Sequence, residues 1–223
     1  MKEVILDTET TGLFVKDGHR IVEIGCIELE NLLPTKNRFH CYLNPERKVS
    51  EKALEVHGYT DEFLSKQKKF SEVVDDFLNF IENKRLVIHN AEFDLSHLNN
   101  ELNLLGKKKI NSEDAVDTLS LAREKFPGSP VSLDALCKRY RIDNSNRAQH
   151  TALVDCDLLS KVYINLLDQK EPTLNFQSQD KETITTNSIA TQTYYKKVIK
   201  PTEEELKSHK EYLKNNLKKN FFN

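Results

Sequence analysis

The stretch VILDTETTGL, residues 4–13, leads an apolar run directly into two carboxylates. The apolar residues predict a buried β-strand, and Asp7 and Glu9 fall where that strand ends. Side chains of a strand alternate between its two faces, so these carboxylates project from the same face, a few ångströms apart. Such close like charges favour a bound cation. Taken alone, a polar turn over residues 10–12 with Glu9 in solvent is an equally good interpretation.

The composition is that of an ordinary globular protein. Its 223 residues are enough for one sizeable core plus an appendage, and the formal net charge of −2 gives no global basic field for nucleic acid. The four cysteines are scattered without a C-x-x-C pair, which argues against a zinc ribbon and a disulfide framework. No apolar stretch is long enough to span a bilayer and a strand begins almost at once, so we expect a cytoplasmic protein with no membrane partner.

Hydrophobic periodicity predicts an α/β fold in which helices cover a mixed sheet. The predicted strands are 3–6, 21–29 and 39–43, as an antiparallel meander, and a buried strand at 86–88. The predicted helices are 71–82, capped by Ser71, and segments near 94–105, 115–125, 132–140 and 151–167.

The composition changes near residue 169. The following segment, to about residue 193, is rich in polar residues with few apolar anchors, which predicts a flexible tether. A helix restarts at Thr202, whose spacing to Glu205 fits a capping box, and three leucines then recur on one face. The predicted parts are a folded domain at 1–168, a linker at 169–200 and a terminal amphipathic helix within 201–223.

A second acidic stretch is VIHNAEFDL, residues 87–95, where a short buried strand again runs into acidic residues. Asp94 lies close to the apolar stripe of the following helix, so it should face inward. In isolation, a first-turn aspartate that serves the helix dipole is the commoner interpretation.

A third stretch, AQHTALVDCDLL at 148–159, runs into a helix whose phase separates two aspartates. Asp155 shares the apolar stripe, whereas Asp157 points roughly 200° away and is expected at the surface. A bare buried carboxylate costs several kcal/mol, so a cation or a basic partner is expected at Asp155. His150 lies in the preceding loop, where a lone histidine is more often structural than catalytic.

Four inward acidic residues with one histidine are far less expected by chance than each residue alone. They predict two divalent ions about 3.5–4 Å apart that act on a phosphodiester. Oxygen ligands favour Mg²⁺ or Mn²⁺ over zinc, and the histidine is placed to act as general base. The set is Asp7, Glu9, Asp94, Asp155 and His150.

Three motifs, DTETTG at 7–12, HNAEFD at 89–94 and HTALVD at 150–155, resemble the exonuclease motifs of the DnaQ-like, or DEDDh, 3′→5′ exonucleases in order and spacing. The stretches at 56–64 and 132–145 further resemble the proofreading epsilon subunits of bacterial DNA polymerase III. The resemblance covers nearly the whole chain and implies a ribonuclease-H-like mixed sheet with flanking helices.

The resemblance also implies roles for individual residues. Asp7, Glu9, Asp94 and Asp155 correspond to the family's metal ligands, and His150 to its general base. Thr8, Thr10 and Thr11 fall where the family's first motif lines the 3′-terminal nucleotide. His89 and Phe93 are secondary candidates for substrate contact, and by residue type they fit a loop histidine and a core phenylalanine equally well.

The implied partners are single-stranded or frayed DNA 3′ ends, the polymerase alpha subunit through the tail helix, and the sliding clamp through residues 171–176. The clamp peptide of the family normally opens with Gln, and Glu171 departs from that pattern, although Leu174 and Phe176 fit as apolar anchors. The alternative functions are an RNA-trimming exonuclease, a non-catalytic replicase scaffold and, less well matched to the spacing of Asp7 and Glu9, a ribonuclease-H-type endonuclease.

Overall fold

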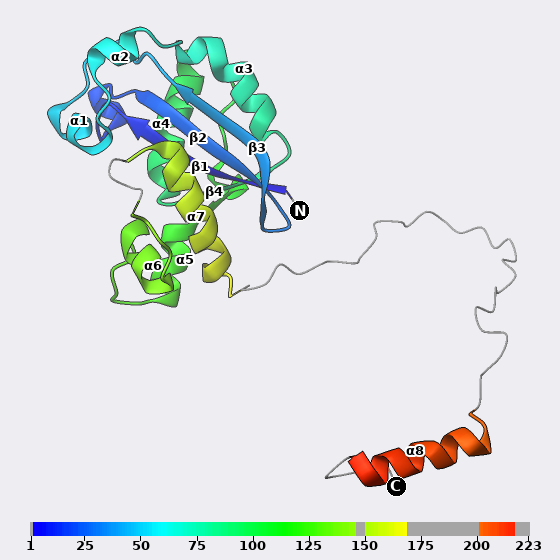
Figure 1. Ribbon diagram of the computed structural model, residues 1–223. Coiled ribbons are helices and arrows are strands. Elements are labelled where there is room, and N and C mark those ends of the chain that lie inside the picture. Colours follow the sequence, from blue (N-terminus) through cyan, green and yellow to red (C-terminus); the bar gives the residue numbers. More distant parts are fainter. Residues whose placement is uncertain (1, 146–149, 169–200, 217–223) are drawn as a thin grey trace, which may run out of the picture. The chain divides into compact units, whose positions relative to one another are not determined.

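The computed structural model describes residues 2–145, 150–168 and 201–216 (Figure 1). The chain divides into two units, Met1–Phe176 and Gln177–Asn223. The expected linker with its clamp peptide, and the last seven residues, lie outside the described residues.

A five-stranded mixed sheet forms the centre of the first unit, in the order β3-β2-β1-β4-β5. The strands β1, β2 and β3 pair antiparallel, as the predicted meander requires, while β4 and β5 add in parallel on the other side of β1 (Figure 1). The strand bounds are β1 Lys2–Thr10, β2 Ile21–Glu30, β3 Leu33–Tyr42, β4 Arg85–Ile88 and β5 Ala115–Asp117.

Helices cover both faces of this sheet. One core lies between the sheet and helices α3 and α4, and a second core lies between the sheet and helices α5, α6 and α7. The α-helices are α1 Glu51–His57, α2 Asp61–Ser65, α3 Phe70–Ile81, α4 Ala91–Leu104, α5 Thr118–Lys125, α6 Leu133–Tyr140 and α7 Ala152–Leu166, with short 3₁₀ turns at Val15–Asp17 and Ser112–Asp114. The predicted mixed sheet with flanking helices is confirmed.

Two of the predicted helices have the wrong start. The segment 115–125 is not one helix, because Ala115–Asp117 pairs with β4 and the helix begins only where the Asp117 carboxylate accepts the Leu119 N–H at 3.0 Å. The helix predicted from Ser71 begins one residue earlier, at Phe70. Its N-cap residue is Lys69 and not Ser71, and the Glu72 carboxylate accepts the Lys69 N–H at 2.7 Å.

The described part of the second unit is one helix, α8, Glu203–Asn216. The predicted capping box is present, since Glu205 accepts the Thr202 N–H at 2.8 Å and the Thr202 hydroxyl accepts the Glu205 N–H at 3.3 Å. None of the helices described is long and apolar enough to span a membrane. The four cysteines, all within the described residues, form no disulfide, as the sequence predicted.

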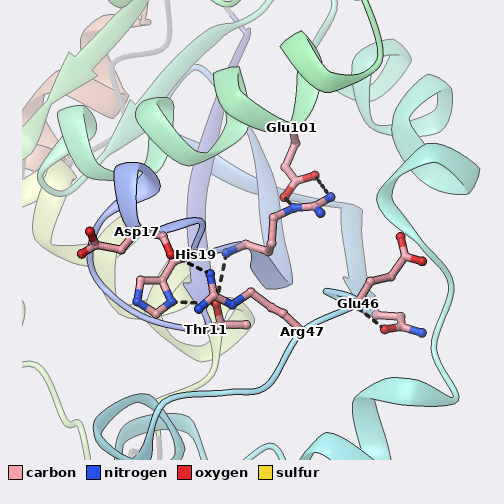
Figure 2. Close-up of polar contacts among 8 residues, drawn as sticks. Thr11, Asp17, His19, Glu46, Arg47 and Glu101 are labelled. Atoms are coloured by element: carbon pink, nitrogen blue, oxygen red, sulfur yellow. Dashed lines mark hydrogen bonds and ion pairs between the residues drawn. The ribbon is translucent and has the colours of Figure 1, made fainter.

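A partly buried ion pair joins the residue before β2 to α4. The Arg20 guanidinium donates from Nε and Nη2 to the two carboxylate oxygens of Glu101, at 2.5 and 2.6 Å (Figure 2). Glu101 is buried, and the Arg20 backbone N–H donates to the Thr11 hydroxyl at 3.1 Å. The pair therefore joins α4 to the segment between β1 and β2, at the end of β1.

Replacing Glu101 by Gln should lower the free energy of unfolding by about 1–2 kcal/mol, because it leaves the partly buried Arg20 charge without its counter-ion. Urea unfolding of the full chain measures this change. The matched control is Glu62→Gln, which breaks a solvent-exposed pair with Lys66 and should leave the stability nearly unchanged. Equal effects of the two variants would contradict a stabilising role for the Arg20 pair.

Candidate active site

The predicted site lies at a switch point of the sheet. The central strand β1 has the antiparallel β2 on one side and the parallel β4 on the other. At such a point the connections leave toward opposite faces, and the carboxyl ends of the parallel strands open a crevice where ligands bind. Asp7 and Glu9 lie within the last four residues of β1, still paired with Gly25 and Glu23 of β2, so the strand extends through both carboxylates before any turn begins.

The strand alternation sends the residues of β1 toward two helices. Val4 and Leu6 belong to the core beneath α3 and α4, and Ile5 belongs to the core beneath α7. By the same alternation Thr8 faces α4, whereas Asp7 and Glu9 face α7. Residues on both faces of one strand can thus meet carboxylates delivered by two helices.

Asp94 is delivered by the first turn of α4. The helix begins directly after Asn90, which adopts the left-handed conformation at φ 73°. Thr8 holds the Asp94 carboxylate twice, because its N–H and its hydroxyl both donate to Oδ1, at 3.0 and 2.7 Å. Asp94 is buried, so its predicted inward orientation is confirmed.

Asp155 is delivered by the first turn of α7 and is likewise buried. Its Oδ2 lies 3.3 Å from Nδ1 of His150, whose side chain is 41% exposed. One ligand atom from each of Glu9, His150 and Asp155 lies within 4.8 Å of the other two. Asp157 points outward as predicted and pairs with Lys161 at 2.6 Å.

Burial and mutual repulsion dominate the electrostatics of the site. Burial raises the pKa of Asp7 well above its ordinary value, and the negative charges of Asp94, Glu9 and Asp155 raise it further. Burial raises the pKa of Asp94 to about 7, although the hydrogen bonds from Thr8 oppose the shift. A cluster of oxygen ligands with unfavourable negative charge is the donor set that suits hard divalent cations. The residues present therefore fit a divalent metal site.

The other predicted residues separate into two groups. Thr10 and Phe93 line a cavity beside Glu9. Thr8 and Thr11 are buried and contact neighbouring side chains of the protein. Thr8 donates to Asp94, and the Thr11 hydroxyl lies 3.0 Å from Nδ1 of His19 (Figure 2). His89 lies 2.9 Å from the Thr118 hydroxyl.

The cavity beside Glu9 measures about 540 Å³, which is in the range of small-ligand sites. Its walls come from the end of β1, the loop after it, α1 and the start of α4. The lining residues are Glu9, Thr10, Gly12, Leu13, Phe14, His19, Ser50, Lys52, Ala53, Val56, His57 and Phe93. Most of these were not predicted, because they lie on an irregular loop and on a helix of seven residues whose pattern is too short to identify.

A larger open groove, about 820 Å³, lies elsewhere. It is formed by residues within 78–86 and 108–114, which lead into β4 and β5, so it lies at the amino ends of the parallel strands. It contains none of the predicted site residues, and its acidic and basic side chains are mixed. The carboxyl-end cavity is therefore the one associated with the chemistry.

Comparisons with known proteins agree with this geometry. The exonuclease family model, RNase_T, matches residues 4–163. The chain is 48% identical to the DNA polymerase III subunit epsilon of Rickettsia felis, over 98% of both chains. It is 42% identical to that of Salmonella typhimurium, over 95% of this chain and 92% of the relative.

Solved structures confirm the fold. Exonuclease X in complex with 5′ overhanging duplex DNA aligns with a TM-score of 0.59 at 24% identity, over 75% of this chain and 92% of that one. The nuclease domain of 3′hExo, a DEDDh family member bound to rAMP, aligns with a TM-score of 0.63 at 18% identity, over 76% of this chain and 92% of that one. The predicted ribonuclease-H-like architecture is thereby confirmed.

The raised pKa of Asp94 predicts that the metal-free protein loses stability as the pH rises. Between its ordinary value near 4 and its folded value of about 7, the native state holds a proton that the unfolded state has released, so the free energy of unfolding falls through this window. Urea unfolding in a chelator at about pH 5 and about pH 8 measures the fall.

The matched variant is Asp94→Asn, which cannot ionise at this position. Its free energy of unfolding should equal that of the parent near pH 5 and exceed it near pH 8. At the higher pH, Mn²⁺ should strongly stabilise the parent and not the variant. Parallel pH curves for the two proteins would contradict the raised pKa of Asp94.

Proposed function

We infer the function of this chain from its family, because it belongs to the exonuclease family and within it to the epsilon subunits of DNA polymerase III. We propose that it removes mispaired nucleotides from DNA 3′ ends during replication. The observation that carries the proposal is the meeting of acidic side chains from β1, α4 and α7 at the end of β1. Glu9, which lines the cavity, has ligand atoms within 4.8 Å of His150 and Asp155, and Thr8 beside it holds Asp94. The chain is an enzyme, a 3′→5′ exonuclease of the proofreading type.

The ligand set proposed for the cofactor is Asp7, Glu9, Asp94 and Asp155. The family uses divalent metal ions, and the oxygen-only carboxylate set supports Mg²⁺ or Mn²⁺. Two such ions, when bound, supply electrostatic stabilisation of the attacking and leaving oxygens of a phosphodiester. The protein supplies the fixed positions of the ligands, through Thr8 on Asp94 and through the packing of α7 on β1 and β2.

His150 is proposed as the general base. Its partly exposed ring can accept the proton of the attacking water and release it to solvent, while the Asp155 carboxylate, 3.3 Å from Nδ1, orients the ring. The water oxygen then forms a new bond to phosphorus, the bond from phosphorus to the 3′ oxygen of the preceding nucleotide breaks, and that oxygen takes up a proton from solvent. The products are a nucleoside 5′-monophosphate and a DNA chain shortened by one residue.

The cavity beside Glu9 is proposed to receive the terminal nucleoside. Leu13, Phe14 and Phe93 provide apolar and aromatic surface on which a base can stack, and Lys52 adds a positive charge. A base enters such a cavity only after it leaves its stack and its partner strand. A mispaired end has already lost part of that stability, so its transfer costs less than that of a paired end.

The division of the chain supports a partner-bound enzyme. The first 168 residues carry the complete proposed site, and α8 is a separate short helix whose Leu206 and Tyr212 are exposed. We assign residues 1–168 to catalysis, 169–200 to a linker and 201–223 to contact with the polymerase alpha subunit. Residues 171–176 are proposed to contact the sliding clamp. These assignments rest on the family relationship and on the amphipathic pattern of the tail.

Shortening of an end-labelled single-stranded DNA oligonucleotide tests the enzyme. The parent should release nucleotides one at a time only with Mg²⁺ or Mn²⁺, and His150→Ala should lower the rate by roughly 10²–10⁴. Asp7→Asn and Asp155→Asn should be at least as damaging. The matched control is Asp157→Asn, two residues further along α7 and directed to solvent, which should keep the parent rate.

The choice of substrate separates this function from its alternatives. A circular single strand should resist the enzyme, since it has no end, and a mispaired 3′ terminus should be shortened faster than a paired one. Equal turnover of RNA and DNA would support an RNA-trimming enzyme instead. No metal-dependent shortening by the parent would support a replicase scaffold.

Removal of residues 201–223 should abolish binding to the polymerase alpha subunit and leave the rate on single-stranded oligonucleotides within about twofold, because the site lies wholly in the first 168 residues. Leu174→Ala with Phe176→Ala should weaken binding to the sliding clamp and leave polymerase binding intact. Surface-immobilised partners measure both interactions, and each variant is the control for the other. Unchanged binding of the truncated chain to the alpha subunit, or of the double variant to the clamp, would contradict the role proposed for that segment.

A further inference from the structure

A second carboxylate of the sheet, Glu23, lies beside the proposed ligands without belonging to them. It stands opposite Glu9 in the register of β1 and β2, faces α7, and is fully buried. We propose that Glu23 is a positioning residue, which fixes the first turn of α7 and thereby holds Asp155 against the carboxylates of β1. This inference rests on the proposed function of the site.

Glu23 is the convergence point of three elements. Its Oε2 accepts the backbone N–H of Ala152 at 3.0 Å and the Tyr59 hydroxyl at 2.8 Å. Its Oε1 lies 2.7 Å from Nε2 of His40 on β3. The carboxylate therefore connects the start of α7 to β3 and to the segment between α1 and α2, where Tyr59 lies.

The contact with Ala152 replaces an ordinary helix cap. The first backbone N–H groups of a helix have no partner within the helix, and a nearby side chain usually satisfies one of them. Thr151, the N-cap residue of α7, makes no such side-chain bond. Glu23, 129 positions away in the sequence, accepts the Ala152 N–H in the first turn of α7. Its negative charge also suits the positive end of the helix dipole.

Two further contacts fix α7 on β2. A Cβ atom on Gly25 would lie 2.6 Å from the backbone carbon of Ala152, so only glycine permits this approach. The Cys156 thiol donates to the Gly25 carbonyl at 3.2 Å. The contacts at Ala152 and Cys156 bracket Asp155, so a displacement of the first turn would move that carboxylate away from Asp7 and Glu9.

A carboxylate suits this position because the Ala152 N–H and the Tyr59 hydroxyl both donate to it, and the His40 ring lies within hydrogen-bond distance of its other oxygen. The amide of a glutamine offers one acceptor oxygen in place of two and carries no charge, so it weakens the interaction with the helix dipole and with the donors around it. Burial and the charge of Glu23 raise the pKa of Tyr59 far above its ordinary value, so the tyrosine hydroxyl keeps its proton and donates. Glu23→Gln is therefore a conservative change in shape that disturbs the anchoring of α7.

The test compares Glu23→Gln with Glu28→Gln in the full chain. Glu28 is also a buried carboxylate of β2, but its partners are Lys84, Lys2 and Asn37, remote from α7. We expect Glu23→Gln to lower kcat on a single-stranded oligonucleotide by about 10–100-fold with KM nearly unchanged, and to weaken Mn²⁺ binding by a similar factor. Glu28→Gln should lower the melting temperature without these effects.

Hydrogen exchange at the Ala152 amide gives a readout that does not depend on catalysis. Exchange should accelerate in Glu23→Gln and not in Glu28→Gln, even if the parent proves inactive on DNA, so failure of the proposed function and failure of this inference are distinguishable. Unchanged exchange at Ala152, or equal losses of kcat in both variants, would overturn the positioning role.

Tyr59→Phe removes one donor to Glu23 and keeps the charge, so it serves if Glu23→Gln fails to fold. It should show the same changes in weaker form, a several-fold fall in kcat with faster exchange at Ala152. A folded Tyr59→Phe protein with parental kcat and parental exchange would overturn the inference in that case.

Discussion

Mutual repulsion among buried carboxylates is the constraint on which this structure depends. Asp7 and Asp94 both have raised pKa values, because burial and neighbouring negative charge oppose their ionisation. Folding must therefore bring together groups that repel one another, and a divalent cation relieves the same repulsion. Metal binding and folding stability are consequently linked, since whatever binds only the assembled site stabilises the native state.

The carboxylates are held by contacts that lie just outside the site. The helix that carries Asp94 is fastened to the sheet by the ion pair of Arg20 and Glu101, and its carboxylate is held by Thr8. The helix that carries Asp155 is fastened through Glu23. Arg20 immediately precedes β2, and Glu23 lies near the start of that strand. One end of one strand therefore positions helices on both faces of the sheet.

The sequence predicted the ligands better than the contacts that position them. Asp94 and Asp155 could be identified because a carboxylate on an apolar helix stripe is chemically unusual, and both are buried as expected. Glu23 carries no such signal, because its role depends on a strand register and on a helix 129 residues away. The three-residue strand β5 and the short helices α1 and α2 were missed for a simpler reason, since they are too short to show a period.

The same contrast bears on how the site is assembled. The positioning contacts have partners within the protein, so they do not require a metal ion. The Arg20 guanidinium pairs with Glu101, and Glu23 is contacted by the Ala152 N–H, the Tyr59 hydroxyl and the His40 ring. Helices α4 and α7 are therefore held in place before any cation binds. The cation then has only to displace protons from the carboxyl groups whose pKa values are raised. A site whose ligands are already fixed needs little rearrangement when charge develops on a phosphodiester, and this preorganisation is what stabilises a transition state more than a ground state.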